Sequence, residues 1–210
     1  MNSGTHLEDE QLNLLAQQDY ILLENFFTED VLTQIEVFFE TTRSSGVLEK
    51  AAIGTKDNEK IISEIRGDHI YWLDKVRDQF ELPIFDQLEV VMSTLNRSFF
   101  LSLSDYEFHL ALYPPGTYYK KHLDQFKARN NRMISMIIYL NPDWKTGDGG
   151  ELKIYPSNSD PILIPPTYNR CILFRSDALY HEVLLSHKMR RSITGWMLYQ
   201  PSPVASIPGV

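Results

Sequence analysis

The sequence predicts a mostly β domain with flanking helices. In the C-terminal half, eight short runs rich in β-branched and aromatic residues follow one another, and Pro, Gly, Asn and Asp residues separate them. In the N-terminal half, apolar residues recur at helical spacing. Short strands at such intervals are typical of a sandwich or barrel, so we expect the helices to cover one face of it.

The N-terminal elements come first. Residues 8–18 contain three leucines and are a candidate short helix, and residues 20–27 form an apolar run that we expect to be a strand. Residues 28–42 start with a threonine, a candidate N-cap, followed by two acidic residues that suit the first turn of a helix. Residues 44–59 are polar and contain two glycines, which favours a loop or hairpin. Residues 83–95 begin with proline, which is common in a first helical turn.

The β-rich half follows these helices. We expect one domain over residues 1–210, in which helices within about residues 8–98 support a β region over about residues 104–200. The expected strands of that region are residues 108–113, 119–123, 133–140, 151–155, 162–164, 171–174, 181–185 and 190–199.

Composition limits the choice of partners and compartment. The chain carries a formal net charge of −8, which opposes binding to nucleic acid, because that binding needs clustered Lys and Arg. Its apolar runs are far shorter than the ~20 residues that span a bilayer, and its first residues lack a secretory pattern. The single cysteine, Cys171, cannot form an internal disulfide. We therefore expect a cytoplasmic protein with neither a membrane nor a nucleic acid partner, and a monomer.

One stretch, YPPGTYYKKHLD at residues 113–124, is the candidate centre of the chemistry. It ends in His122 and Asp124, and residues two apart in a strand project to the same face. His181 follows downstream, and Arg190 comes nine residues later. Two histidines and one carboxylate on one side of a metal form the facial arrangement of non-haem Fe(II) oxygenases.

These motifs, with YLNPDW after them, carry a resemblance over roughly residues 60–200. The set resembles the 2-oxoglutarate and Fe(II)-dependent oxygenases, and more narrowly the HIF-type prolyl hydroxylases and their bacterial relatives. The resemblance implies the double-stranded β-helix, or jelly-roll, fold. It also implies that Fe(II), 2-oxoglutarate and O2 are required, with ascorbate as a reductant. The implied reaction decarboxylates 2-oxoglutarate to succinate and CO2 and hydroxylates a prolyl residue.

Arg190 is the candidate partner of the co-substrate. A dicarboxylate that chelates a metal with one end leaves its other carboxylate buried, and a buried charge must be paired. The planar guanidinium of arginine suits a carboxylate. Alternation along the strand places Arg190, Thr194 and Trp196 on one face and Arg191 on the other, and the resemblance also selects Arg190.

Further residues carry over from the resemblance one at a time. Tyr139 and Thr194 match residues that bind the distal carboxylate of 2-oxoglutarate. Tyr113, Ile137 and Leu152 match positions that line the same pocket, although simple core packing explains the apolar ones equally well. Trp196 is either a core residue or a wall beside the metal where the substrate prolyl sits.

The segment RGDHIYW, residues 66–72, resembles the RGD-x-I-x-W loop that folds over the substrate in prolyl hydroxylases; without the resemblance, it would be interpreted as a turn. The resemblance places Arg66, Asp68, Tyr119 and Arg132 with Trp196 among the substrate-binding residues. We expect Asp68 to pair with Arg132 and to help close this loop over the site.

The remaining histidines have other expected roles. We expect His69 on the surface of the loop, His109 with its hydrogen bonds satisfied within a strand, and His187 in an exposed hairpin. His187 lies three residues from Arg190, so His181 is the better candidate ligand.

The expected partner is a protein with an exposed prolyl loop. The bacterial branch of the family resembles enzymes that act on elongation factor Tu, which makes that protein the first candidate substrate. Two alternatives stay open: a hydroxylase of a small molecule such as a free amino acid, and a non-catalytic jelly-roll module that senses 2-oxoglutarate or oxygen.

Overall fold

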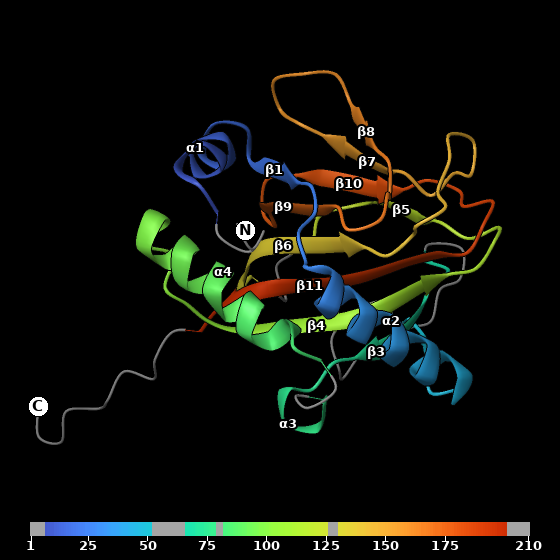
Figure 1. The fold of residues 1–210 in the computed structure, drawn as a ribbon. Coiled ribbons are helices and arrows are strands. Elements are labelled where there is room, and N and C mark those ends of the chain that lie inside the picture. The colour runs from blue at the N-terminus through green and yellow to red at the C-terminus, as the bar shows by residue number, and fades with distance from the viewer. Residues whose placement is uncertain (1–6, 52–65, 79–81, 126–129, 201–210) are drawn as a thin grey trace, which may run out of the picture.

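Two antiparallel sheets, with helices on the outside of the larger one, make up the fold in the computed structural model (Figure 1). The structure describes residues 7–51, 66–78, 82–125 and 130–200. The predicted elements in residues 52–65 therefore lie outside the described residues.

Four helices form in the described part of the chain. They are α1 (Asp9–Gln18), α2 (Glu29–Ser44), α3 (Lys75–Asp78) and α4 (Ile84–Phe99). At α1, the Glu8 and Gln11 side chains bond reciprocally to each other's backbone N–H groups, which caps its first turn. The three predicted helices are confirmed, and two of them end a few residues later than expected. None of the described helices is long and apolar enough to cross a bilayer.

Among the described residues, all strand pairs are antiparallel. The larger sheet has seven strands in the order β1 (Tyr20–Leu23), β9 (Cys171–Arg175), β6 (Arg132–Tyr139), β11 (Arg190–Tyr199), β4 (Leu103–Tyr113), β3 (His69–Trp72) and β2 (Glu49–Lys50). The smaller sheet has four, in the order β5 (Tyr119–His122), β10 (Tyr180–Val183), β7 (Leu152–Tyr155) and β8 (Ile162–Ile164). All eight strands predicted for the C-terminal half are confirmed.

Two predictions near the N-terminal half were wrong in detail. The strand expected over residues 20–27 ends at Leu23, because Asn25 takes a left-handed backbone with φ of 52° and turns the chain. Asn169 then accepts hydrogen bonds from the backbone N–H groups of Phe26 and Phe27. Part of residues 66–72, interpreted as a turn or loop, forms β3, because its backbone pairs with β4 along Leu110 and Leu112.

The larger sheet is buried on both faces, and each face has its own core. Side chains of alternate residues, such as Leu110 and Ile193, pack with α2 and α4, which lie over one face of the sheet in Figure 1. Their neighbours, such as Ala111 and Tyr139, pack with the smaller sheet. Helices thus cover one face, as predicted, and the space between the sheets lies on the other.

The centre of the larger sheet is tightly packed at Gly195. A Cβ atom there would lie 2.3 Å from the carbonyl oxygen of Glu107 and 2.3 Å from the ring of Phe108. Only glycine lets β11 approach β4 this closely.

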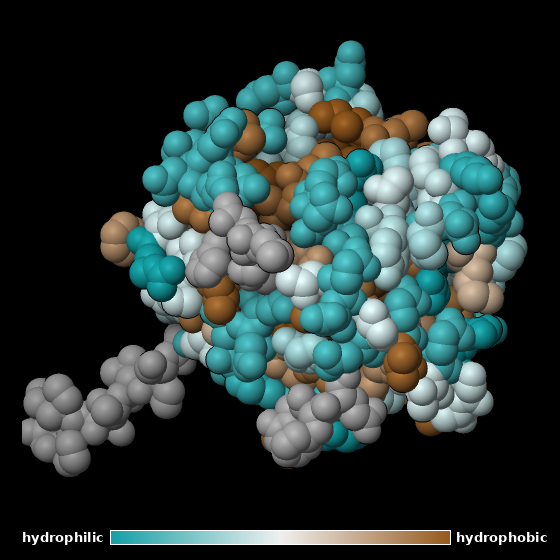
Figure 2. Space-filling model, viewed as in Figure 1, coloured by the Kyte–Doolittle hydropathy of each residue, from teal (hydrophilic) through white to brown (hydrophobic). Residues whose placement is uncertain are grey.

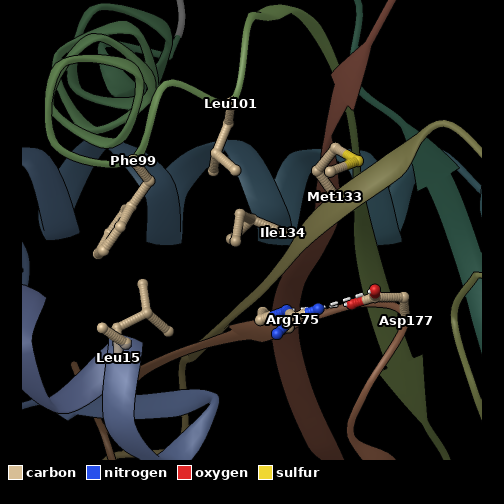
Figure 3. A pocket seen from close by; sticks show the side chains of 8 residues that line it. Leu15, Phe99, Leu101, Met133, Ile134, Arg175 and Asp177 are labelled. Atoms are coloured by element: carbon tan, nitrogen blue, oxygen red, sulfur yellow. Dashed lines mark hydrogen bonds and ion pairs between the residues drawn. The ribbon is translucent and has the colours of Figure 1, made fainter.

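One face of the molecule is mostly polar (Figure 2), and one of the cavities lies near the outer helices. Most of the face seen in Figure 2 is hydrophilic, with hydrophobic side chains visible in the gaps between polar ones. Near α1 and the end of α4, a cavity of about 340 Å³ is lined mainly by apolar side chains, and the Arg175–Asp177 ion pair lies on one side of it (Figure 3). Its other labelled residues are Leu15, Phe99, Leu101, Met133 and Ile134.

Candidate active site

Three potential metal ligands meet between the sheets. His122 ends β5, Asp124 follows two residues later, and His181 lies opposite His122 on β10. One ligand atom from each side chain lies within 4.8 Å of the other two. Asp124 Oδ1 is 3.4 Å from His122 Nε2, and Asp124 Oδ2 is 3.6 Å from His181 Nε2. The described part of the chain holds no second group of this kind.

Backbone carbonyls orient both imidazoles. His122 Nδ1 lies 2.7 Å from the carbonyl oxygen of Lys120, and His181 Nδ1 lies 3.1 Å from that of Leu179. A carbonyl only accepts, so each Nδ1 carries the proton and each Nε2 presents a lone pair. Burial lowers the pKa of His181 to about 4, which keeps this ring neutral at neutral pH. Both rings are therefore ready to coordinate a cation.

Asp124 is held as a carboxylate. Burial favours its neutral form, but the adjacent His181 and His122 and the Ser135 hydroxyl outweigh burial and hold its pKa well below the usual range. Ser135 Oγ donates to Asp124 Oδ2 at 2.7 Å, and Ser176 Oγ lies 2.8 Å from Ser135 Oγ. The sequence analysis missed this pair of serines. The alternation that places Ile137 and Tyr139 in the inner core includes position 135, and it was the available signal.

Arg190 is a buried cation whose charge the described chain leaves unpaired. Its side chain is 3% exposed, and its Nε donates to the carbonyl oxygen of Gly150 at 2.9 Å. Its Nη1 lies 3.4 Å from Ser192 Oγ, and among the described residues no carboxylate lies within ion-pair distance of Arg190. A buried guanidinium without an acidic partner is costly unless an anion completes it.

Two rings and one hydroxyl lie beside this guanidinium. Its central carbon is 4.9 Å from the ring centroid of Tyr113 and 5.1 Å from that of Tyr139. Burial raises the pKa of Tyr139 to about 12 against the opposing effect of the nearby Arg190 guanidinium. Among the described residues, no group lies in hydrogen-bond geometry with its hydroxyl. Thr194 Oγ1 lies 3.1 Å from Ser192 Oγ. The Tyr139 hydroxyl and the Ser192–Thr194 hydroxyl pair therefore gather around Arg190.

Most of the predicted site residues line one cavity. Its lining contains the three potential ligands together with Arg66, His109, Tyr113, Tyr119, Ile137, Leu152, Val183, Arg190, Thr194 and Trp196. Of the predicted set, Tyr139, Asp68 and Arg132 are not in the lining itself but contact residues that are.

Arg191 faces away from the cavity, as predicted from the alternation along β11. Its Nη1 lies 2.6 Å from Glu36 and 3.3 Å from Glu40, both on α2. The two neighbouring arginines therefore serve opposite faces of one strand, and α2 covers the outer one.

The predicted pair between Asp68 and Arg132 was wrong. Asp68 accepts two hydrogen bonds from Arg66, at 2.6 and 2.8 Å, and a pair only two residues apart forms with little loss of chain entropy. Arg132 lies instead 3.3 Å from the ring centroid of Trp196 and bonds Glu107 at 2.6 Å. The two arginines thus belong to separate clusters.

The cluster formed by Arg66 and Asp68 is linked to the potential metal ligand His122 through the ring of Tyr119. Arg66 lies 4.9 Å from the ring centroid of Tyr119, and Tyr119 stacks on His122 at 3.8 Å. Gly67 lets this segment approach the turn before β5, since a Cβ atom on it would lie 2.7 Å from that of Thr117.

The prediction that His109 makes satisfied hydrogen bonds was also wrong. The side chain is buried in the cavity wall, and both ring nitrogens lack a partner among the described residues. His187, in contrast, is exposed as expected, and His69 is half-buried in β3.

The chain is similar to known proteins in both sequence and structure. The family model described as the 2OG-Fe(II) oxygenase superfamily matches residues 108–198. A hypoxia-inducible factor prolyl hydroxylase of Caenorhabditis elegans is 30% identical over 208 residues, which cover 92% of this chain. The chain spans 28% of that relative's length.

Solved structures give the same result over nearly the whole chain. A prolyl-4-hydroxylase of Pseudomonas putida superposes with a TM-score of 0.80 at 29% identity, covering 91% of this chain and 98% of that one. A prolyl hydroxylase of Trichoplax adhaerens, solved with a peptide fragment of the hypoxia-inducible factor oxygen degradation domain, gives 0.84 at 26% identity, covering 93% and 90%.

The paired sheets and the His–Asp–His cluster between them are those of a 2-oxoglutarate and Fe(II)-dependent oxygenase domain, and this chain carries a domain of that superfamily over residues 108–198. Its relatives and structural neighbours are prolyl hydroxylases, including a bacterial one. The predicted jelly-roll fold is confirmed. The superfamily requires Fe(II), 2-oxoglutarate and O2, as expected.

Proposed function

We propose that the chain is a prolyl 4-hydroxylase that modifies a prolyl residue in a protein loop. One observation carries the proposal: three potential ligands within 4.8 Å of one another share a cavity with Arg190, a buried cation whose charge has no partner in the described chain. Similarity to prolyl hydroxylases over most of the chain supports the choice of substrate class.

The residues present fit an iron centre. His122 Nε2, His181 Nε2 and one oxygen of Asp124 would hold Fe(II), since two imidazoles and a carboxylate are the ligand set of non-haem Fe(II) oxygenases. When bound, the iron supplies oxidation by O2: one oxygen atom enters a C–H bond of the substrate, and the other enters succinate as 2-oxoglutarate loses CO2. Ser135 keeps Asp124 oriented for this role.

Arg190 would bind the distal carboxylate of 2-oxoglutarate. Its Nε is committed to Gly150 and its Nη1 has only the long contact to Ser192, so both Nη groups keep N–H donors for an anion. Tyr139 and Thr194 would add hydrogen bonds, and Tyr113, Ile137 and Leu152 would exclude water around the carbon chain. The protonated Tyr139 hydroxyl suits this role because it can donate to a carboxylate.

The substrate would enter beside Trp196. This ring lines the cavity, and Arg132 lies against its face. On the other side, Arg66 and Asp68 hold the start of β3 near Tyr119, so they would position the substrate chain. We propose an exposed prolyl loop of elongation factor Tu as the first substrate to test.

The experiment incubates the protein with Fe(II), 2-oxoglutarate, O2 and elongation factor Tu. We expect succinate to form and a prolyl residue to gain one oxygen atom, detected by mass spectrometry of the digested protein. If the same gain appears only in the protein fraction of a host lysate, the proposed activity stands, but elongation factor Tu is not the substrate. If no prolyl residue in either sample gains oxygen, the proposed activity is wrong.

A matched pair of variants tests the co-substrate assignment. Arg190→Leu removes the cation inside the cavity, and Arg191→Leu removes its neighbour on the outer face of the same strand. A charge-assisted bond contributes about 1.5–3 kcal/mol, so Arg190→Leu should raise the KM for 2-oxoglutarate by at least about tenfold. Arg191→Leu should leave that KM within about twofold of the original. Equal effects would contradict the assignment.

A further inference from the structure

His109 stands in a row of side chains that crosses the larger sheet into the cavity. Its Cα pairs with that of Trp72 on β3 and with that of Thr194 on β11, and Thr194 pairs in turn with Ile137 on β6. Residues paired directly across strands share one face, so these four side chains point toward the smaller sheet. Trp72 is 44% exposed, whereas His109 is 1% exposed. This row of side chains therefore runs from the molecular surface into the candidate site. His109 lies between its exposed end at Trp72 and its buried end at Ile137.

Aromatic rings fill the space around this imidazole. The ring centroid of Trp72 lies 4.9 Å from that of His109 in an edge-to-face contact, and the ring centroid of Trp196 lies 5.6 Å away. Neither nitrogen of His109 has a hydrogen-bond partner among the described residues. A buried polar group without a partner is rare in native proteins and calls for an explanation. A bound ligand that supplies the missing partner is such an explanation, because His109 also lines the cavity.

The imidazole is uncharged. Burial, with the positive charges of Arg66 and Arg132 adding to it, holds the pKa of His109 well below its ordinary value. A neutral imidazole offers one N–H donor and one acceptor nitrogen. Its missing partner can therefore be an uncharged group such as the carbonyl oxygen of an amide.

We propose that His109 is a substrate-binding residue that donates a hydrogen bond to the carbonyl oxygen of the target prolyl residue, with Trp72 and Trp196 enclosing the pyrrolidine ring. This inference rests on the proposed prolyl hydroxylase function. A prolyl residue within a chain has no backbone N–H, so its carbonyl oxygen is the only backbone polar group that it presents. The single donor of a neutral imidazole matches that single acceptor.

The test compares two variants of the Fe(II)-loaded protein. His109→Leu removes the donor, whereas His109→Gln keeps an N–H donor of similar reach. The substrate is any peptide that the original protein oxidises within a synthetic library of capped heptapeptides with a central proline. We expect His109→Leu to raise the KM for the peptide by about three- to tenfold, the range for loss of one neutral hydrogen bond. His109→Gln should recover most of the loss, and both variants should keep the original KM for 2-oxoglutarate.

A chemically altered peptide separates binding from packing. In this probe, a methylene group replaces the prolyl carbonyl of the selected peptide, and competition against the parent peptide measures its inhibition constant. The original protein should prefer the parent, and His109→Leu should have lost most of that preference. Equal preference in both proteins would overturn the proposal, as would a change confined to the KM for 2-oxoglutarate. If the original protein oxidises no library peptide, the KM comparison is made with the protein substrate identified above. If no protein is oxidised either, the prolyl hydroxylase function fails, and this inference fails with it.

Discussion

His122 and His181 lie opposite each other on adjacent antiparallel strands, with their ring centroids 4.3 Å apart. Four strands separate them in the sequence, so the candidate metal site exists only once the smaller sheet has formed. Conversely, a metal bound by both rings would join β5 to β10 and stabilise that sheet, because binding to the folded state alone adds to stability.

Replacing His181 and His187 by alanine, one at a time, tests which of them is a metal ligand. His181→Ala should abolish Fe(II) binding and lower activity by at least about a hundredfold, the upper range for loss of an outer-shell partner. His187→Ala, at an exposed position, should change neither. An anaerobic titration with Fe(II) and 2-oxoglutarate, followed by the visible charge-transfer band, measures the binding. A band of normal intensity in His181→Ala would exclude this residue as a ligand.

Ser135 provides a milder test of the same site. Ser135→Ala removes the hydroxyl that donates to Asp124 at 2.7 Å, so Asp124 loses one of the groups that orient it. We expect Fe(II) affinity to fall about 10–100-fold with the fold intact. Ser159→Ala, on an exposed turn, is the control. Unchanged Fe(II) affinity in Ser135→Ala would show that the serine only fills space.

Tyr139→Phe should separate co-substrate binding from stability. The hydroxyl of Tyr139 is buried without a partner, so removing it should leave the melting temperature unchanged or slightly higher. The KM for 2-oxoglutarate should rise about three- to tenfold, because the donor is lost. Tyr180→Phe, at a half-exposed position on β10, should alter neither quantity. A large fall in melting temperature with an unchanged KM would place the hydroxyl in the core and not in the site.

Asp78 lies outside the candidate active site, and its ionisation should make the free energy of unfolding depend on pH. Burial favours its neutral form, but hydrogen bonds from Arg77, from the backbone of Asp74 and from Tyr71 outweigh burial and lower its pKa. A carboxyl whose folded-state pKa is depressed stabilises the fold at neutral pH, and this contribution is lost as the pH falls below about 4.

Asp78→Asn should therefore lower the free energy of unfolding at pH 7 and make it less dependent on pH in the acid range. Asp86→Asn, on the exposed face of α4, should leave the dependence as it was. Urea unfolding at a series of pH values measures both. Parallel curves for the original protein and Asp78→Asn would refute the assigned role.

Sequence patterns predicted what depends on local periodicity. The strands after residue 103, the helices, and the faces of Arg190 and Arg191 all follow from alternation or helical spacing. The order of His122, Asp124 and His181 was informative because few ligand sets share it. The resemblance then supplied the expected co-substrate residues, most of which the fold brings to one cavity.

The wrong predictions concern which of several possible partners a side chain or strand contacts. Arg66 and Arg132 are both suitable for Asp68, and only the three-dimensional path of the chain selects Arg66. His109 was expected to find a hydrogen bond because most buried histidines do, and no local pattern shows that its neighbours are two tryptophans. The β3 strand was missed because its pairing partner lies far along the chain.

The close contact at Gly195 fixes which residues of β11 serve chemistry and which serve folding. If β11 slipped by one position, an arginine would still enter the cavity, because Arg191 would replace Arg190. Ile193 and Gly195 would then stand where Ser192 and Thr194 do now, and those two polar residues would press against the helices. The contact with Glu107 and Phe108 admits only a residue without a Cβ atom, so this misalignment is blocked sterically. Gly195, the smallest residue of β11, thereby fixes the register of this strand against β4.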